Sequence, residues 1–82
     1  MPKPTSLSDS KNLIGQQLIE LRKQQGLSQR ALAYKLQLAG YDIDKNVITR
    51  IETNKRYVTD IELKAFSSVL NVTYACLIDG RE

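Results

Sequence analysis

The feature that most constrains the fold is a pair of short amphipathic segments between residues 27 and 52, each with its own helix-start signal. Ser28 precedes the first segment and Asp44 precedes the second, and the side chains of both can accept hydrogen bonds from the free amides of a helix's first turn. Both segments are too short to be stable helices in isolation, so other elements must pack against them. Apolar residues recur at helical spacing in each: Leu32, Ala33 and Leu36 in the first, and Ile48 and Ile51 in the second.

Apolar periodicity before this pair predicts a third helix. Ile14, Leu18 and Leu21 recur at i, i+4 and i+7, and Gly26 is a typical residue for the end of such a helix. The predicted helices of this half of the chain cover about residues 12–25, 29–39 and 45–53.

Two more helices are predicted after residue 58. Thr59 and Glu62 have the spacing of a capping box, in which each side chain bonds the other residue's backbone amide. Asn71 is expected to end this helix, and Thr73 to begin a last one that holds Leu77 and Ile78. The predicted fold class is therefore all-α, with five helices and no sheet. The buried stripe expected for the fourth helix is Ile61, Ala65, Phe66, Val69 and Leu70.

Length and composition fit one small domain. The 82 residues allow a flexible N-terminal arm at 1–11, where Pro2 and Pro4 oppose a helix, and one domain at 12–80. With a single cysteine, Cys76, and no histidine, we expect no internal disulfide, no metal and no cofactor. The sequence has no signal-peptide pattern and no apolar run long enough to cross a bilayer, so we expect a cytoplasmic protein with no membrane partner.

The charge is concentrated in the middle of the chain. The whole sequence has a net charge of +3, but residues 22–56 contain eight basic and three acidic residues. A basic centre suits a surface that approaches phosphates from one side, although a solvated charged face is the simpler alternative. An enzyme is the class with the least support, because the carboxylates are scattered or cap helices and Cys76 has no histidine to activate it.

Five short blocks of sequence follow one another along the chain. The blocks are Leu21-Arg22 with Gly26-Leu27-Ser28-Gln29, then Leu32-Ala33, then Ile48-Thr49-Arg50-Ile51-Glu52, then Lys55-Arg56, and finally Leu70-Asn71-Val72-Thr73 ahead of Leu77. In this order they resemble the lambda-repressor-like, Cro/C1-type (XRE family) helix-turn-helix domains of bacteria and phages, over about residues 13–80. The resemblance implies a five-helix domain that binds double-stranded DNA, with helix 45–53 in the major groove.

One departure from the family pattern lies between the two helices of the pair. The spacing from Ala33 to Ile48 is five residues longer than is common in the family. Because Leu38, Tyr41 and Ile43 are apolar enough to pack, we expect an extra turn on the second helix and an ordered loop after it.

The recognition helix supplies the candidate base contacts. If Ile48 and Ile51 are buried, the opposite side of helix 45–53 turns outward and toward the groove. The side chain of Arg50 suits guanine O6 and N7, and that of Asn46 suits adenine N6 and N7. The residues expected to read bases are Lys45, Asn46, Thr49, Arg50 and Thr53.

Contacts to phosphates are expected from outside this helix. Gln29 lies at the positive end of the second helix, and Lys55 and Arg56 follow the third. Such contacts fix the register of a protein on DNA without reading its sequence. The resemblance also implies a structural ion pair between Arg22 and Glu52.

Two functions remain open at this point. The first is a transcriptional repressor that binds a palindromic operator as a homodimer, with the last helix and Tyr74 or Ile78 at the dimer contact. Its release from DNA would depend on concentration or on a regulatory protein partner. The alternative is a protein-interaction module on the same fold, such as an antitoxin or a transcription co-regulator or adaptor. An adaptor would need an apolar exposed face on helix 45–53, and the polar residues there favour DNA.

Overall fold

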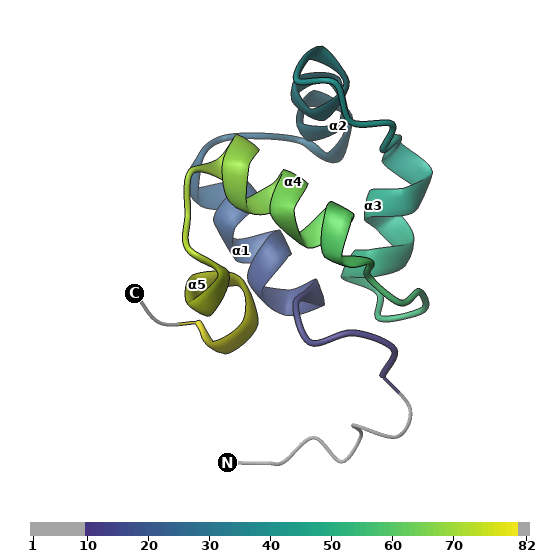
Figure 1. Cartoon of the computed structure of the whole chain (residues 1–82), viewed down its shortest axis with the longest axis vertical. Helices are drawn as coiled ribbons and strands as arrows, with labels where there is room; N and C mark the ends of the chain where they lie inside the picture. The colour runs from purple at the N-terminus through teal and green to yellow at the C-terminus, as the bar shows by residue number, and fades with distance from the viewer. Residues whose placement is uncertain (1–9, 81–82) are drawn as a thin grey trace.

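The computed structural model describes residues 10–80, and this part of the chain is built of five α-helices joined by short loops (Figure 1). No strand occurs within these residues, which confirms the predicted all-α class with five helices. None of the described helices is both long and apolar enough to span a membrane. The helices are α1 (Gly15–Gln24), α2 (Gln29–Leu38), α3 (Lys45–Glu52), α4 (Asp60–Leu70) and α5 (Tyr74–Asp79).

The helix ends follow the local signals of the sequence. The side chain of Ser28 accepts from the amide of Ala31, and Thr59 and Glu62 form the predicted capping box, with both bonds at 3.1 Å. Asn71 ends α4 in the left-handed conformation, with φ at 59°. Asp44 and Thr73 cap α3 and α5 in the same way as Ser28 caps α2.

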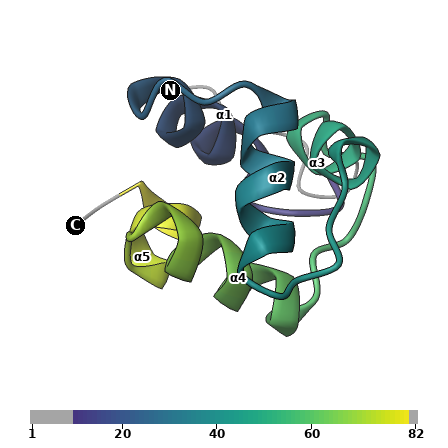
Figure 2. The ribbon, with the colours of Figure 1, turned by 90° about the horizontal axis from the view of Figure 1, so that it is seen from above.

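A single core lies between the helices, and every helix contributes to it. Seen from above, α2 stands beside α3, with α1 on one side and α4 and α5 on the other (Figure 2). Each helix contributes at least one completely buried side chain, such as Leu18, Leu32, Ile48, Phe66 and Leu77.

Three predictions about packing or boundaries were wrong. The first helix begins at Gly15 instead of residue 12, because Asn12 uses its side chain to bond the end of α3. Ile61 is 67% exposed and Leu38 is 70% exposed, although both were expected to pack. At 100° per residue Ile61 lies about 140° around α4 from Phe66, and Leu38 lies on the far side of α2 from the buried stripe.

The connection between α2 and α3 is an ordered loop, as predicted. Ile43 is buried, Tyr41 packs partly against the core, and the amide of Tyr41 donates to the carbonyl of Leu36 at 2.9 Å. The side chain of Gln37 also donates to the carbonyl of Ile43. The loop therefore holds α3 against α2 and does not leave it loosely attached.

The first turn of α1 packs unusually closely against the end of α3. A methyl group at Gly15 would lie 2.7 Å from the carbonyl oxygen of Ile51 and 2.7 Å from the side-chain nitrogen of Asn54. Only glycine leaves enough room for this approach, which sets the position of α3 relative to the body of the domain.

Candidate nucleic-acid interface

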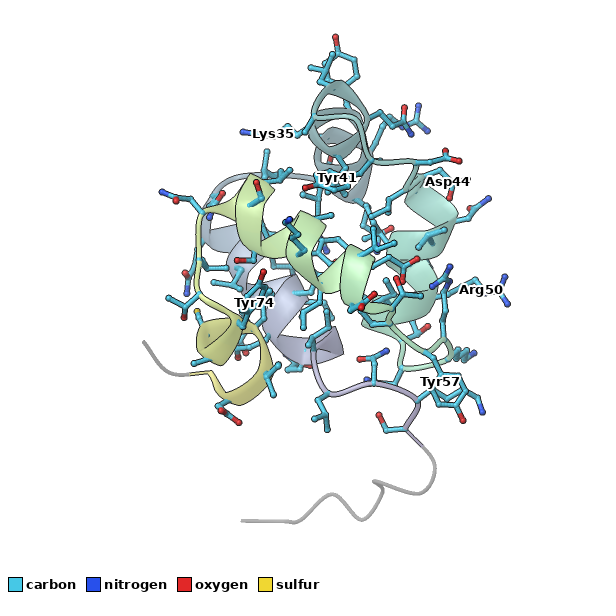
Figure 3. The ribbon with its side chains drawn as sticks, in the orientation of Figure 1. Lys35, Tyr41, Asp44, Arg50, Tyr57 and Tyr74 are labelled. Atoms are coloured by element: carbon cyan, nitrogen blue, oxygen red, sulfur yellow. The ribbon has the colours of Figure 1, made fainter. Side chains whose placement is uncertain are left out.

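The third helix has one buried face and one polar, exposed face. Ile48 and Ile51 are fully buried against the core. Arg50 projects from α3 away from the body of the molecule (Figure 3). Of the five residues expected to read bases, Thr49 is half-buried, and four are exposed: Lys45, Asn46, Arg50 and Thr53.

An ion pair ties the end of α3 to α1. Arg22 Nε lies 2.8 Å from Glu52 Oε2, and Arg22 Nη2 lies 3.1 Å from Glu52 Oε1. The two side chains are only 12% and 3% exposed. The remaining terminal nitrogen of Arg22 donates to the carbonyl of Leu27, just before α2 begins. The pair therefore connects α1, α3 and the start of α2. The negative charge of Glu52 lies on the buried side of α3 and is paired there with Arg22.

The side chain of Gln29 belongs to the same network. Its Nε2 donates to Glu52 Oε1 at 2.8 Å, and its Oε1 accepts from the hydroxyl of Thr49 at 2.9 Å. Both ends of the amide are thus engaged within the protein. Toward a phosphate, Gln29 offers the second N–H of this amide and its position at the N-terminus of α2, where backbone amides carry partial positive charge.

The loop after α3 is basic, and its two cations differ in setting. Lys55 is exposed. Arg56 Nη1 instead lies 2.8 Å from Glu62 Oε1 and also donates to the carbonyl of Tyr57. Glu62 is also the carboxylate of the α4 capping box, so the side chain of Arg56 is tied to the start of that helix.

Asn12 is a supporting residue that the sequence did not reveal. Its Nδ2 donates to the carbonyl oxygens of Ile51 at 3.0 Å and Arg56 at 2.9 Å. Its Oδ1 accepts from the amides that begin α1, including that of Gly15 at 2.8 Å. One side chain thus ties the first turn of α1 to the last turn of α3 and to the basic loop.

Arg30 was also missed, although its signal was visible in the sequence. It lines the same surface depression as Lys45, with Ala33, Tyr34 and Gln37 completing the lining. A basic residue in the first turn of α2, beside the tip of α3, extends the cationic surface. The signal in the sequence was that this basic residue directly follows Gln29, which was expected to contact phosphate.

Within residues 10–80, no three His, Cys, Asp or Glu side chains gather where they could hold a metal ion.

Comparison with known proteins places this geometry in a family. The family model HTH_3, described as helix-turn-helix, matches residues 18–75. No curated protein matches the chain. Among solved structures, the restriction-modification controller protein C.AhdI from Aeromonas hydrophila is 30% identical, with a TM-score of 0.67 over 78% of this chain and 86% of that one.

Two further structures have the same fold. An HTH_3 family transcriptional regulator from Vibrio cholerae is 27% identical, with a TM-score of 0.71 over 85% of this chain. The match covers 36% of that protein, so this chain corresponds to about a third of it. The hypothetical transcription factor NHTF from Neisseria matches with a TM-score of 0.70 at 18% identity, over 87% of this chain and 76% of that one, and supports the fold alone.

Proposed function

The chain belongs to the HTH_3 helix-turn-helix family of DNA-binding regulators, and we propose that it is a repressor that binds a palindromic operator as a homodimer. In this proposal α3 lies in the major groove and Lys45, Asn46, Thr49, Arg50 and Thr53 read base edges. Lys55, Arg56 and the N-terminus of α2 at Gln29 contact phosphates. Its role is binding without catalysis, in the cytoplasm.

The observation that carries this proposal is the character of the exposed face of α3. Ile48 and Ile51 are fully buried, so the helix is held firmly while its polar side chains point outward. The negative charge of Glu52 is paired with Arg22 on the inner side. An approaching phosphate backbone therefore meets Arg50, Lys45 and Lys55, and not the carboxylate of Glu52.

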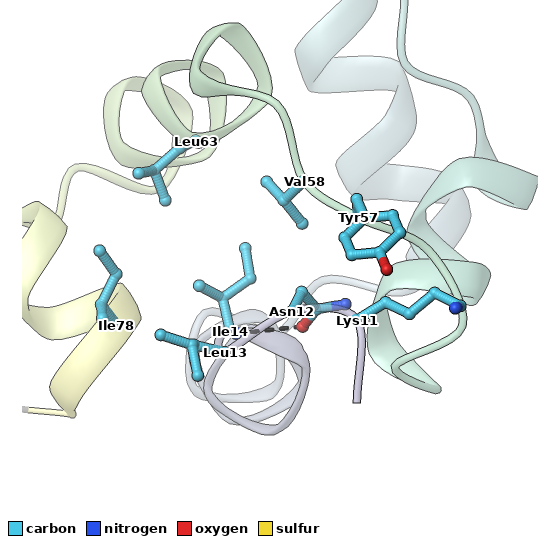
Figure 4. Close-up of a pocket in the computed structure, with 8 residues that line it drawn as sticks. All are labelled: Lys11, Asn12, Leu13, Ile14, Tyr57, Val58, Leu63 and Ile78. Atoms are coloured by element: carbon cyan, nitrogen blue, oxygen red, sulfur yellow. Dashed lines mark hydrogen bonds between the residues drawn. The ribbon is translucent and has the colours of Figure 1, made fainter. Parts of the chain in front are cut away.

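Homodimerisation is supported by exposed apolar side chains on and around α4 and α5. We define the α4–α5 patch as Leu13, Ile61, Tyr74 and Ile78, all of them large and exposed. Two depressions that share Leu63 lie within it. In the first of them, the side chains of Leu13 and Ile78 lie close together (Figure 4).

A second copy of the chain is the occupant that we propose for this patch. A self-complementary apolar surface suits two-fold symmetry, and a palindromic site requires the same symmetry of the protein. Tyr74 and Ile78 belong to α5, which lies apart from α3 in both ribbon views, so a dimer contact centred on α5 leaves both recognition helices open (Figures 1 and 2).

Selection of duplexes from a randomised DNA library tests this function. The proposal predicts enrichment of a two-fold symmetric motif whose half-sites are centred about 10 bp, or one helical turn, apart. Affinity for the selected duplex should fall steeply as salt rises, because counterions are released from the contacted phosphates. Failure to enrich any motif, with binding equally weak to all duplexes, would contradict it.

A protein-interaction module is the second candidate, and one observation favours it. Tyr34 and Leu38 lie one turn apart on α2 and are 63% and 70% exposed. Neighbouring side chains, including Lys35 and Val69, line a depression beside Leu38. This surface would suit a regulatory protein partner. Because it lies on α2 and the exposed face of α3 is polar, the surface is compatible with DNA binding by α3.

A further inference from the structure

A chain of hydrogen bonds fixes the direction in which the amide of Gln29 faces. The carboxylate of Glu52, paired with Arg22, can only accept hydrogen bonds. Gln29 Nε2 lies 2.8 Å from Glu52 Oε1, so the amino end of the amide must face Glu52. The carbonyl end then faces α3, where Gln29 Oε1 lies 2.9 Å from the hydroxyl of Thr49. The charge on Glu52 thereby dictates that Thr49 is the donor in this last bond.

The proton of the Thr49 hydroxyl is used inside the protein. Besides Gln29, the hydroxyl oxygen lies 3.0 Å from the backbone carbonyl of Lys45, which also only accepts. A hydroxyl has one proton, so either partner consumes it and the outward side of the oxygen carries lone pairs. Thr49 is half-buried, between the buried Ile48 and the exposed Arg50.

The hydroxyl of Thr53, one turn further along α3, also uses its proton within the protein. Its hydroxyl donates to the carbonyl of Thr49 at 2.9 Å, with the carbonyl of Arg50 at 3.3 Å as the alternative acceptor. The outer face of α3 therefore offers acceptors at its two threonines, whereas Lys45 and Arg50 can only donate. This division is set by bonds within the protein before any DNA is bound.

We infer that Thr49 is an acceptor-only base reader that selects adenine or cytosine, and that Gln29 is the positioning residue that holds it so. The inference rests on the proposed function, in which α3 enters the major groove. The exocyclic amino groups of adenine and cytosine are the hydrogen-bond donors exposed in that groove. Guanine O6 or thymine O4 at the same place would set acceptor against acceptor and is disfavoured.

The role of Gln29 follows from the same contacts. One N–H of the Gln29 amino group donates to Glu52, so this buried carboxylate sets the orientation of the amide before DNA is bound. Gln29 thereby adds a second acceptor for the Thr49 proton and fixes the side chain of Thr49 on the α3 surface. Its substitution should change sequence preference at the base pair that Thr49 reads and nowhere else.

The test compares selected motifs for the wild-type protein, Thr49→Val and Thr49→Ser. Valine keeps the shape of threonine and removes the acceptor, whereas serine retains the hydroxyl. We expect one base pair of each half-site to lose its sequence preference with Thr49→Val and to keep it with Thr49→Ser. Gln29→Met should weaken the same preference to a smaller degree. Thermal melting of each variant establishes that it is folded before its motif is read.

A base analogue then tests the hydrogen bond itself. The adenine or cytosine of this base pair is replaced by the analogue that lacks only the exocyclic amino group. This change should weaken wild-type binding about five- to tenfold, because one neutral hydrogen bond is lost. Thr49→Val should bind both duplexes equally. Equal loss for both proteins, or a motif unchanged by Thr49→Val, would overturn the inference and leave the proposed function standing. A wild-type protein that selects no motif would overturn the proposed function instead.

Discussion

Glu52, on the recognition helix, accepts two bonds from Arg22 on α1, at 2.8 and 3.1 Å. The carboxylate is almost completely buried, with 3% of its side chain exposed. It also accepts from Gln29 at the start of α2, so the side chain of Glu52 joins α3 to both α1 and α2. A negative charge that would oppose phosphates at the surface instead stabilises the fold.

Removal of this carboxylate should destabilise the protein. Glu52→Ala leaves the buried guanidinium of Arg22 without its partner, and we expect a loss of about 3 kcal/mol in the free energy of unfolding. For a domain of this size the melting temperature should fall by roughly 10–20 °C. Glu20→Ala is the matched control, because Glu20 is exposed and its bond is to the exposed Gln16. Equal melting temperatures for the two variants would show that the ion pair contributes nothing.

A methyl group at Gly15 should also be destabilising, against the usual preference of helices for alanine. The group would meet the carbonyl oxygen of Ile51 at 2.7 Å, and a backbone atom cannot move aside cheaply. We expect Gly15→Ala to cost about 2 kcal/mol in urea unfolding, as overpacked sites do. Gln16→Ala, at the exposed next position, should change stability by less than about 0.5 kcal/mol. If Gly15→Ala is as stable as the wild type, α1 does not approach α3 this closely.

The local rules of helix formation explain which parts of the fold could be predicted from the sequence. Ser28, Asp44 and Thr59 cap helices through bonds to residues three positions away, and such short-range signals are visible in one chain. Asn12 is different, because its partners Ile51 and Arg56 lie 39 and 44 residues away. No local pattern distinguishes such a residue from the first residue of a helix.

The candidate site shows the same division. The outward direction of Asn46 and Arg50 follows from helical periodicity alone, and the structure has both exposed. The bonds from Gln29 to Glu52 and Thr49 join two helices across a loop whose length departs from the family pattern. Tertiary contacts of this kind decide which polar groups remain available to DNA, and the sequence does not display them.

The two cations after α3 should behave differently when removed. Lys55 is exposed, so Lys55→Ala should reduce the slope of log affinity against log salt by about 1 and leave melting unchanged. Arg56→Ala should reduce the same slope and also cost about 1 kcal/mol of stability, because Arg56 is paired with Glu62. Titrations of a fluorescent duplex at several salt concentrations measure the slopes. Unaltered slopes for both variants would remove the loop from the DNA contact.

Substitutions at Ile61 and Leu38, two residues of nearly the same exposure, should affect dimerisation differently. Ile61→Asp places a charge in the α4–α5 patch and should convert the dimer to a monomer in sedimentation equilibrium. Leu38→Asp introduces the same charge on α2, at a position of nearly the same exposure, and should leave the dimer intact. The reverse result would place the interface on α2. A wild-type monomer at every concentration, on and off DNA, would contradict homodimerisation itself.

The central claim is that the exposed face of α3 reads DNA sequence with Arg50 at its centre. The most direct measurement is the affinity of the wild type, Arg50→Ala and Lys35→Ala for the selected duplex and for a scrambled duplex at one salt concentration. Lys35 projects on the side of the molecule away from α3, so its variant controls for the loss of one positive charge (Figure 3). The account predicts that Arg50→Ala loses about ten- to a hundredfold in affinity for the selected duplex and little for the scrambled one. Lys35→Ala should keep the wild-type ratio of the two affinities. If Arg50→Ala also keeps that ratio, α3 does not read DNA sequence through Arg50.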